Sequence, residues 1–96
     1  MKNLAIDYGT KLLKAIANEK RLAILYFLVE KELCVSELEK KVKLSQSALS
    51  QHLAILRKEN IVKTRRDAQT IYYSIKSTKS VKVLKLLDDL YNNQYK

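Results

Sequence analysis

The near absence of helix-breaking residues most restricts what this chain can fold into. Its 96 residues contain no proline and a single glycine, Gly9. Because these two residue types are the strongest local breakers, the sequence favours helices joined by short connections. A sandwich or barrel would need more turn residues. The length and an apolar content of 47% predict one globular domain, residues 1–96, with a modest core.

Two amphipathic helices are predicted in the first third of the chain. Leucine, tyrosine and alanine side chains recur at helical spacing over residues 3–17, which indicates a first helix. Asn18 is a good N-cap for a second helix. The buried stripe of that helix is predicted to be Leu22, Leu25, Leu28 and Val29.

A helix-turn-helix is predicted in the middle of the chain. Ser36 and Glu39 have the spacing of a capping box, which would start a short third helix with Leu38 and Val42 inward. A tight turn follows, and Ser45 would cap a fourth helix that runs to about Glu59. A short helix, a brief turn and a second helix form the helix-turn-helix arrangement.

A β-hairpin is predicted next, and then a last helix. Residues 61–66 and 70–76 are rich in β-branched and aromatic side chains and flank a polar loop at 67–69, which is typical of a hairpin. Residues 32–34 could be a short strand or a linker. A fifth helix is expected at 78–92. The predicted fold is therefore mostly α with a small β component, a winged helix-turn-helix of about five helices and a two-stranded wing.

One face of the fourth helix is unusual because it carries little charge, although charged residues make up 30% of the chain. On a helical wheel, Leu49, Leu53 and Leu56 share the core side. The opposite side holds Ser47, Ser50, Gln51, Ala54 and Lys58. Short polar side chains let a helix enter the major groove of DNA and offer hydrogen bonds to base edges. The alternative is a merely polar surface helix.

The surroundings of this face favour contacts with phosphates. Arg57 and Lys58 follow at the end of the helix and suit phosphate groups. At its start, free backbone amides beside Ser45, Gln46 and Ser47 can bind a phosphate. The only histidine, His52, borders the apolar side, where a semi-buried structural or phosphate-contacting role is favoured over metal binding.

The hairpin and the net charge fit the same interpretation. Around the hairpin loop stand Arg65, Arg66, Gln69 and Thr70, which could reach phosphates or a narrow minor groove. The formal net charge is +9, and residues 45–85 hold nine Lys/Arg but only two Asp/Glu. Such a concentration of charge suggests a polyanion, either nucleic acid or an anionic membrane surface. A solubilising surface is the alternative.

Excess apolar surface at both ends of the chain predicts a homodimer. On the last helix, the apolar arc is wider than one core-facing stripe requires. The residues expected to pair with a second copy are Leu4, Tyr8, Leu12, Leu84, Leu87, Leu90 and Tyr91. Two-fold symmetry would present two recognition helices to two half-sites of a double-stranded DNA. The alternative is a wide-faced helix buried in a monomer.

Several classes of protein are disfavoured. A single cysteine, Cys34, excludes an intramolecular disulfide and fits a reducing cytoplasm. No apolar run approaches the ~20 residues needed to span a membrane, and no signal peptide is evident at the start. With one histidine and no nucleophile–base motif or glycine-rich loop, nothing indicates an enzyme or a bound cofactor.

Three segments resemble the ArsR/SmtB family of bacterial winged-helix repressors, closest to the branch with HlyU and BigR. They are ANEKRLAIL at 17–25, ELCVSELEKKVKLSQSALSQHLAILRKENIV at 32–62 and RRDAQTIYYSI at 65–75. The resemblance implies a homodimer through the first and last helices, operator DNA as the ligand, and steric repression or derepression of transcription. The alternative function is an architectural or antagonist protein that binds DNA with little sequence preference.

The sensor sites of that family are not matched here. The arsenic-type motif has three cysteines, but only Cys34 remains, with Ser36 and Glu39 at the other positions. The dithiol pair of the branch corresponds to Glu39 and Asn92, and the zinc-type last helix has aspartates here without histidine. No metal site is therefore expected, and Cys34 is interpreted as a small core residue in preference to a single-thiol switch.

Overall fold

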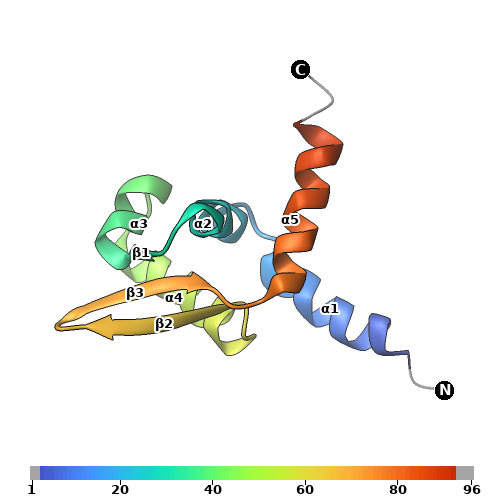
Figure 1. The fold of residues 1–96 in the computed structure, drawn as a ribbon, viewed down its shortest axis with the longest axis horizontal. Coiled ribbons are helices and arrows are strands. Elements are labelled where there is room, and N and C mark those ends of the chain that lie inside the picture. Colours follow the sequence, from blue (N-terminus) through green and yellow to red (C-terminus); the bar gives the residue numbers. More distant parts are fainter. Residues whose placement is uncertain (1–2, 93–96) are drawn as a thin grey trace.

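The computed structural model describes residues 3–92, which form five helices and three strands. Their order and bounds are α1 (Leu4–Ile16), α2 (Glu19–Glu30), β1 (Leu33–Cys34), α3 (Val35–Val42), α4 (Gln46–Lys58), β2 (Val62–Asp67), β3 (Thr70–Ile75) and α5 (Thr78–Tyr91). Figure 1 shows α2, α3 and α4 gathered beside a long β2–β3 hairpin. The predicted fold class, a mostly helical winged helix-turn-helix, is confirmed.

Two helices begin where their predicted N-caps place them. The Asn18 side chain accepts from the amides of Lys20 and Arg21, and the Ser45 hydroxyl accepts from the Ala48 amide. Between α3 and α4, Lys43 turns the chain with a positive φ of 56°. Each cap satisfies amides that the first turn of a helix would otherwise leave unpaired.

The start of α3 differs from the prediction. The helix begins at Val35 and its N-cap is Cys34, so the capping box predicted for Ser36 and Glu39 is wrong. Instead, the Glu37 carboxylate accepts from the Cys34 amide at 3.0 Å. Cys34 itself is half-buried and lies outside the core, so its interpretation as a core residue is also wrong.

The core is formed by one cluster of apolar side chains from all five helices and the sheet. Leu49, Leu53 and Leu56 are fully buried, as the helical wheel predicts. In α2 the prediction holds for Leu25 and Leu28 but not for Val29, which is exposed, while Ile24 is fully buried. The three leucines anchor α4 to the body, so its opposite side faces solvent.

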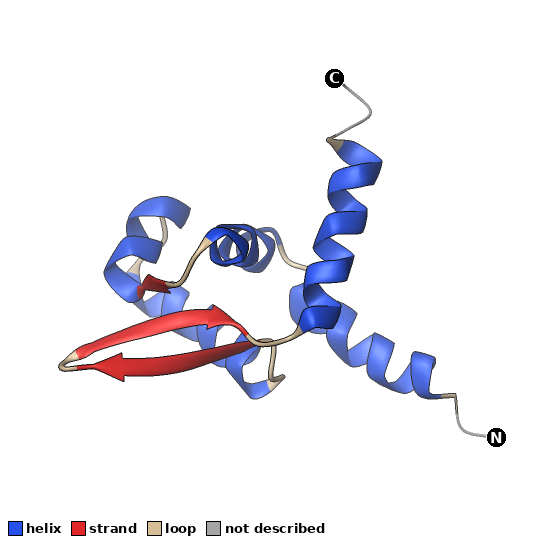
Figure 2. Ribbon diagram, in the orientation of Figure 1, coloured by secondary structure: helices blue, strands red, loops and turns tan. Residues whose placement is uncertain are grey.

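The sheet contains one strand more than the predicted hairpin. Residues 32–34, for which a strand and a linker are both expected alternatives, contain β1, and the strand order is β1-β3-β2, antiparallel throughout (Figure 2). β1 pairs only with Tyr72 and Tyr73 of β3. The hairpin turn is Ala68-Gln69, with Ala68 at a φ of 56°. Beyond Tyr72, the wing therefore projects as two strands alone.

The first and last helices extend away from the body, on the side opposite the wing tip (Figure 1). Leu84 is 2% exposed and belongs to the core of its own chain, so its predicted place in a dimer interface is wrong. The Tyr26 hydroxyl donates to the Leu84 carbonyl at 3.0 Å and ties α5 to α2. Within residues 3–92, no helix has the length and apolar character needed to cross a bilayer.

Candidate nucleic-acid interface

The polar face of α4 is fully available to a ligand. Ser47, Ser50, Gln51 and Ala54 are all exposed. Among the described residues, none of their side chains has a hydrogen-bond partner. The face therefore offers two hydroxyls, an amide and a methyl group on a helix that its buried leucines hold in place, which is the chemistry that base edges in a major groove require.

The start of α4 also remains open. The Ser45 hydroxyl and carbonyl accept from Ala48 and Leu49, which leaves the amides of Gln46 and Ser47 without a partner in the part of the chain described. No acidic residue lies in the first turn. An anion can bind such a helix start through the free amides and the helix dipole.

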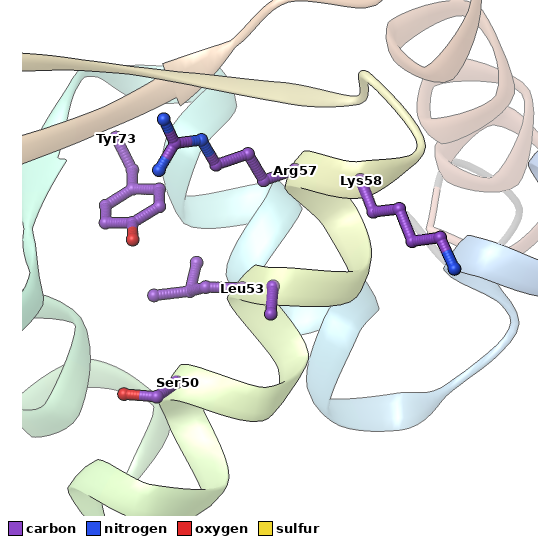
Figure 3. A pocket seen from close by; sticks show the side chains of 6 residues that line it. Ser50, Leu53, Arg57, Lys58 and Tyr73 are labelled. Carbon is purple, nitrogen blue, oxygen red and sulfur yellow. The ribbon is translucent and has the colours of Figure 1, made fainter.

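A hollow of about 510 Å³ lies between α4 and β3. Figure 3 shows Ser50, Leu53, Arg57 and Tyr73 around it, with the Arg57 guanidinium reaching toward the Tyr73 ring. Lys58, which also borders the hollow, points to the opposite side. The two cations at the end of α4 are therefore directed differently, and Arg57 is the one placed over this concave surface.

The sequence pattern does not identify Tyr73, although it lines the hollow. Its place follows from strand alternation: Tyr73 lies opposite Thr64 and Leu33 on the sheet face that packs toward the core. The pairing register gives its sheet face, and the structure shows that this face lies beside α4. A concave surface with hydroxyls and a guanidinium suits a phosphodiester backbone.

The wing carries its polar groups at the tip. Arg66, Gln69 and Thr70 are exposed, and their side chains have no partner among residues 3–92. Arg65 differs, because its guanidinium forms an ion pair with Glu32 at 2.7 Å and lies over the Tyr72 ring. The structure thus joins α4 to Tyr73 of β3 in one hollow, places the free polar groups of the wing at its tip, and engages Arg65 within the protein.

His52 is half-buried beneath this surface. Its Nδ1 lies 3.2 Å from Nη1 of Arg21, whose Nε also donates to the Ala15 carbonyl at 2.6 Å. Arginine can only donate, so Nδ1 accepts and the proton resides on Nε2. Burial and the neighbouring Arg21 charge both lower the pKa of His52. The neutral imidazole links α4 to α2 and to the end of α1.

This contact predicts a pH-dependent stability. In the unfolded chain, His52 takes up a proton around its ordinary pKa of 6.5. In the folded chain, the lowered pKa keeps the imidazole neutral at that pH. The free energy of unfolding should therefore be highest above pH 6.5 and fall as the pH decreases toward the lowered pKa, by at most about 1.4 kcal/mol per pH unit for one proton. Urea unfolding at a series of pH values measures this dependence.

The matched variant is His52→Gln, which keeps a polar side chain but does not titrate. Its stability should be nearly flat between pH 7 and the lowered pKa, where the wild-type curve slopes. Equal slopes in the two proteins would mean that the Arg21–His52 contact does not hold the imidazole neutral.

The family sensor positions form no ligand cluster in the residues described. Between residues 3 and 92 there is no group of three His, Cys, Asp or Glu that could hold a metal ion. Cys34 Sγ lies 3.3 Å from the Ser36 hydroxyl, and hydrogen bonds from Cys34 are the main reason that the pKa of Glu37 is lowered. The Asn92 amide donates to the Asp88 carboxylate. Cys34 and Glu37 thus cap the start of α3, and Asn92 caps the end of α5.

Apolar surface is concentrated on α1 and α5. Seven of the nine exposed large apolar side chains in residues 3–92 lie on these two helices; they are Leu4, Ile6, Tyr8, Leu13, Leu86, Leu90 and Tyr91. Leu12 and Leu87 are half-buried. Beside α1, a groove of about 1020 Å³ includes Leu4, Tyr8 and Leu12 in its lining. Large exposed apolar patches on a folded protein are typical of surfaces that contact another molecule.

The chain is similar to known regulators along most of its length. Residues 18–64 match the family model described as bacterial regulatory protein, arsR family. The transcriptional activator HlyU of Vibrio cholerae is 54% identical over 80 residues, covering 83% of this chain and 74% of that protein. The nodulation protein NolR of Rhizobium meliloti is 58% identical over 81 residues, with 84% and 66% covered.

Further likenesses point the same way. The biofilm growth-associated repressor of Xylella fastidiosa is 36% identical over 85 residues, covering 88% of this chain and 75% of the repressor. The solved structure of HlyU from Vibrio cholerae superposes with a TM-score of 0.87 at 48% identity and covers 94% of this chain and 98% of its own.

Proposed function

The chain belongs to the arsR family of bacterial regulatory proteins and is a DNA-binding transcriptional regulator, not an enzyme; from this premise we propose that it binds an inverted-repeat operator as a homodimer. The observation that carries the proposal is the α4 face, which is exposed, nearly uncharged and, among the described residues, without side-chain hydrogen bonds. A protein that bound DNA through charge alone would not need it.

The contacts divide into base readout and phosphate binding. Base edges are assigned to Ser47, Ser50, Gln51 and Ala54, whose short side chains let α4 approach. Phosphates are assigned to the α4 start at Ser45 and Gln46, to Arg57 and Lys58, and to the wing groups Arg66, Gln69 and Thr70. His52 is assigned a supporting role beneath the face, because Arg21 already holds it.

The homodimer is proposed to form through α1 and α5. The concentration of exposed apolar side chains on these helices supports it, with Leu4, Tyr8, Leu12, Leu87, Leu90 and Tyr91 as the predicted contact residues and the exposed Leu86 added from the structure. Both helices lie opposite the wing tip (Figure 1), so pairing them leaves both α4 faces free. Two copies would then meet half-sites one or more helical turns apart.

Regulation is proposed to occur by occupation of the operator, which excludes either the polymerase or another regulator. Relatives named as an activator and as a repressor are both compatible with such exclusion. Because the ligand is chromosomal DNA, we place the protein in the cytoplasm.

Selection of binding sites from a random duplex library at two salt concentrations tests the proposal. Enrichment of an inverted repeat is expected at both concentrations. Binding without enrichment that disappears at the higher salt would instead support an architectural or antagonist protein, since phosphate contacts alone depend steeply on salt.

Gln51→Ala should identify a base contact. We expect a loss of about 1–3 kcal/mol in operator binding and relaxed preference at one base pair of each half-site. Repeating the selection with this variant measures both. Arg57→Ala is the control, because loss of a phosphate contact should weaken all sequences alike. Unchanged preference in the Gln51 variant would remove this residue from base readout.

A further inference from the structure

The two wing arginines lie on opposite faces of the sheet. Arg65 is opposite Tyr72, and Tyr72 is opposite Cys34. The row on the other face, which packs toward the core, contains Tyr73. Because side chains alternate along a strand, Arg66 shares the Tyr73 face, beside α4, whereas Arg65 lies on the outer face.

Arg65 is held there by two kinds of contact. Its Nε donates to both carboxylate oxygens of Glu32 at 2.9 Å, and its Nη2 lies 2.7 Å from Oε1. The guanidinium centre is 4.5 Å from the Tyr72 ring centroid. A forked ion pair stacked on an aromatic ring fixes the orientation of the guanidinium more tightly than a point charge would.

The position of this pair along the wing is informative. Glu32 immediately precedes β1, and β1 supports the hairpin only as far as Tyr72. Beyond that level only the pairs Arg66–Ile71 and Asp67–Thr70 continue to the turn. The Glu32–Arg65 contact thus crosses the outer face of the three-stranded sheet diagonally, from the residue before β1 to Arg65, which lies at the last level where β1 supports the wing.

We propose that Arg65 is a positioning residue that aims the wing, and that Arg66 is the arginine that contacts DNA phosphate. The proposal rests on the proposed function, since it concerns how the wing reaches operator DNA. Two nitrogen atoms of Arg65 are already engaged with Glu32, while Arg66 has no partner among residues 3–92 and lies on the α4 face. The competing role is an Arg65 that leaves Glu32 to bind phosphate.

Operator affinity measured across a salt series separates the two roles. Arg65→Ala should weaken binding severalfold and leave the slope of log affinity against log salt unchanged. Arg66→Ala should make that negative slope shallower by about 0.9, the value for one lost phosphate contact. Lys63→Ala is the matched control, because Lys63 is an exposed cation on the outer face of the same strand and has no partner among the residues that the structure describes.

Two Glu32 variants sharpen the test. If Arg65 positions the wing, Glu32→Gln should weaken binding, and exchanging the charges with Glu32→Arg and Arg65→Glu together should recover much of the affinity lost in either single variant. If Arg65 instead leaves Glu32 to bind phosphate, Glu32→Gln would tighten binding and steepen the slope of log affinity against log salt. Either of those two results, or a reduced slope in Arg65→Ala, would overturn the proposal.

Hydrogen exchange of the free protein tests, without DNA, whether the Glu32–Arg65 contact holds the wing in position. Amides of residues 66–71 should exchange faster in Arg65→Ala and Glu32→Gln but not in Lys63→Ala, while thermal midpoints stay close to wild type because both side chains are partly exposed. Unchanged exchange would refute the positioning role. A wild-type protein without operator preference would instead refute the proposed function, so the two failures are distinguishable.

Discussion

Replacing Ser50 with glutamate is expected to reduce operator affinity by more than about 100-fold. Ser50 lies at the centre of the exposed α4 face and borders the hollow below the wing. A carboxylate there would face the phosphate-rich groove, and juxtaposed like charges cost several kcal/mol in a complex, at about 1.4 kcal/mol for each tenfold loss. Fluorescence anisotropy with the selected operator measures the change.

The control is Ser50→Gln, which has the same size as glutamate but no charge. It should lose far less affinity than Ser50→Glu, and the difference between the two isolates the electrostatic term. Neither variant should unfold the protein, since the position is exposed and both residues favour helices more than serine does. Affinity within tenfold of wild type for Ser50→Glu would place DNA on some other surface.

The parts of the interface that rest on local signals were predictable from sequence. The Ser45 cap and the leucine spacing define where α4 begins and which side it buries, and both are confirmed. The serine and glutamine side chains follow directly, because a helix with a known buried side has a known exposed side. The same reasoning placed the start of α2 after Asn18, whose side chain caps it.

Features that depend on tertiary contacts were not predictable. Two overlapping capping patterns exist near α3, and the one at Cys34 and Glu37 is used because pairing of β1 with β3 ends at Cys34. Leu84 has the periodicity of an interface residue, but only packing against the body shows that it is buried. Contacts between distant segments are likewise invisible to periodicity, such as Arg65 with Glu32 across 33 positions.

The double substitution Leu86→Glu with Leu90→Glu is expected to convert the protein to a monomer and to abolish tight operator binding. Both leucines lie on α5, four residues apart, and are 55% and 43% exposed in the single chain. Two charges there would have to be buried in the proposed interface without partners, which is strongly unfavourable. Sedimentation or light scattering measures the mass, and anisotropy measures operator affinity.

The double substitution should reduce operator affinity strongly, although neither leucine is proposed to contact DNA. A dimer binds two half-sites with the second contact made at high effective concentration, an advantage of about 10²–10⁴ that a monomer loses. Val29→Glu is the control, since Val29 is an exposed apolar residue of α2 outside both interface helices; this variant should remain dimeric and bind normally. A Leu86/Leu90 variant that stayed dimeric would show that α5 does not form the dimer interface. A monomeric variant with full affinity would show that operator binding does not depend on pairing through α5.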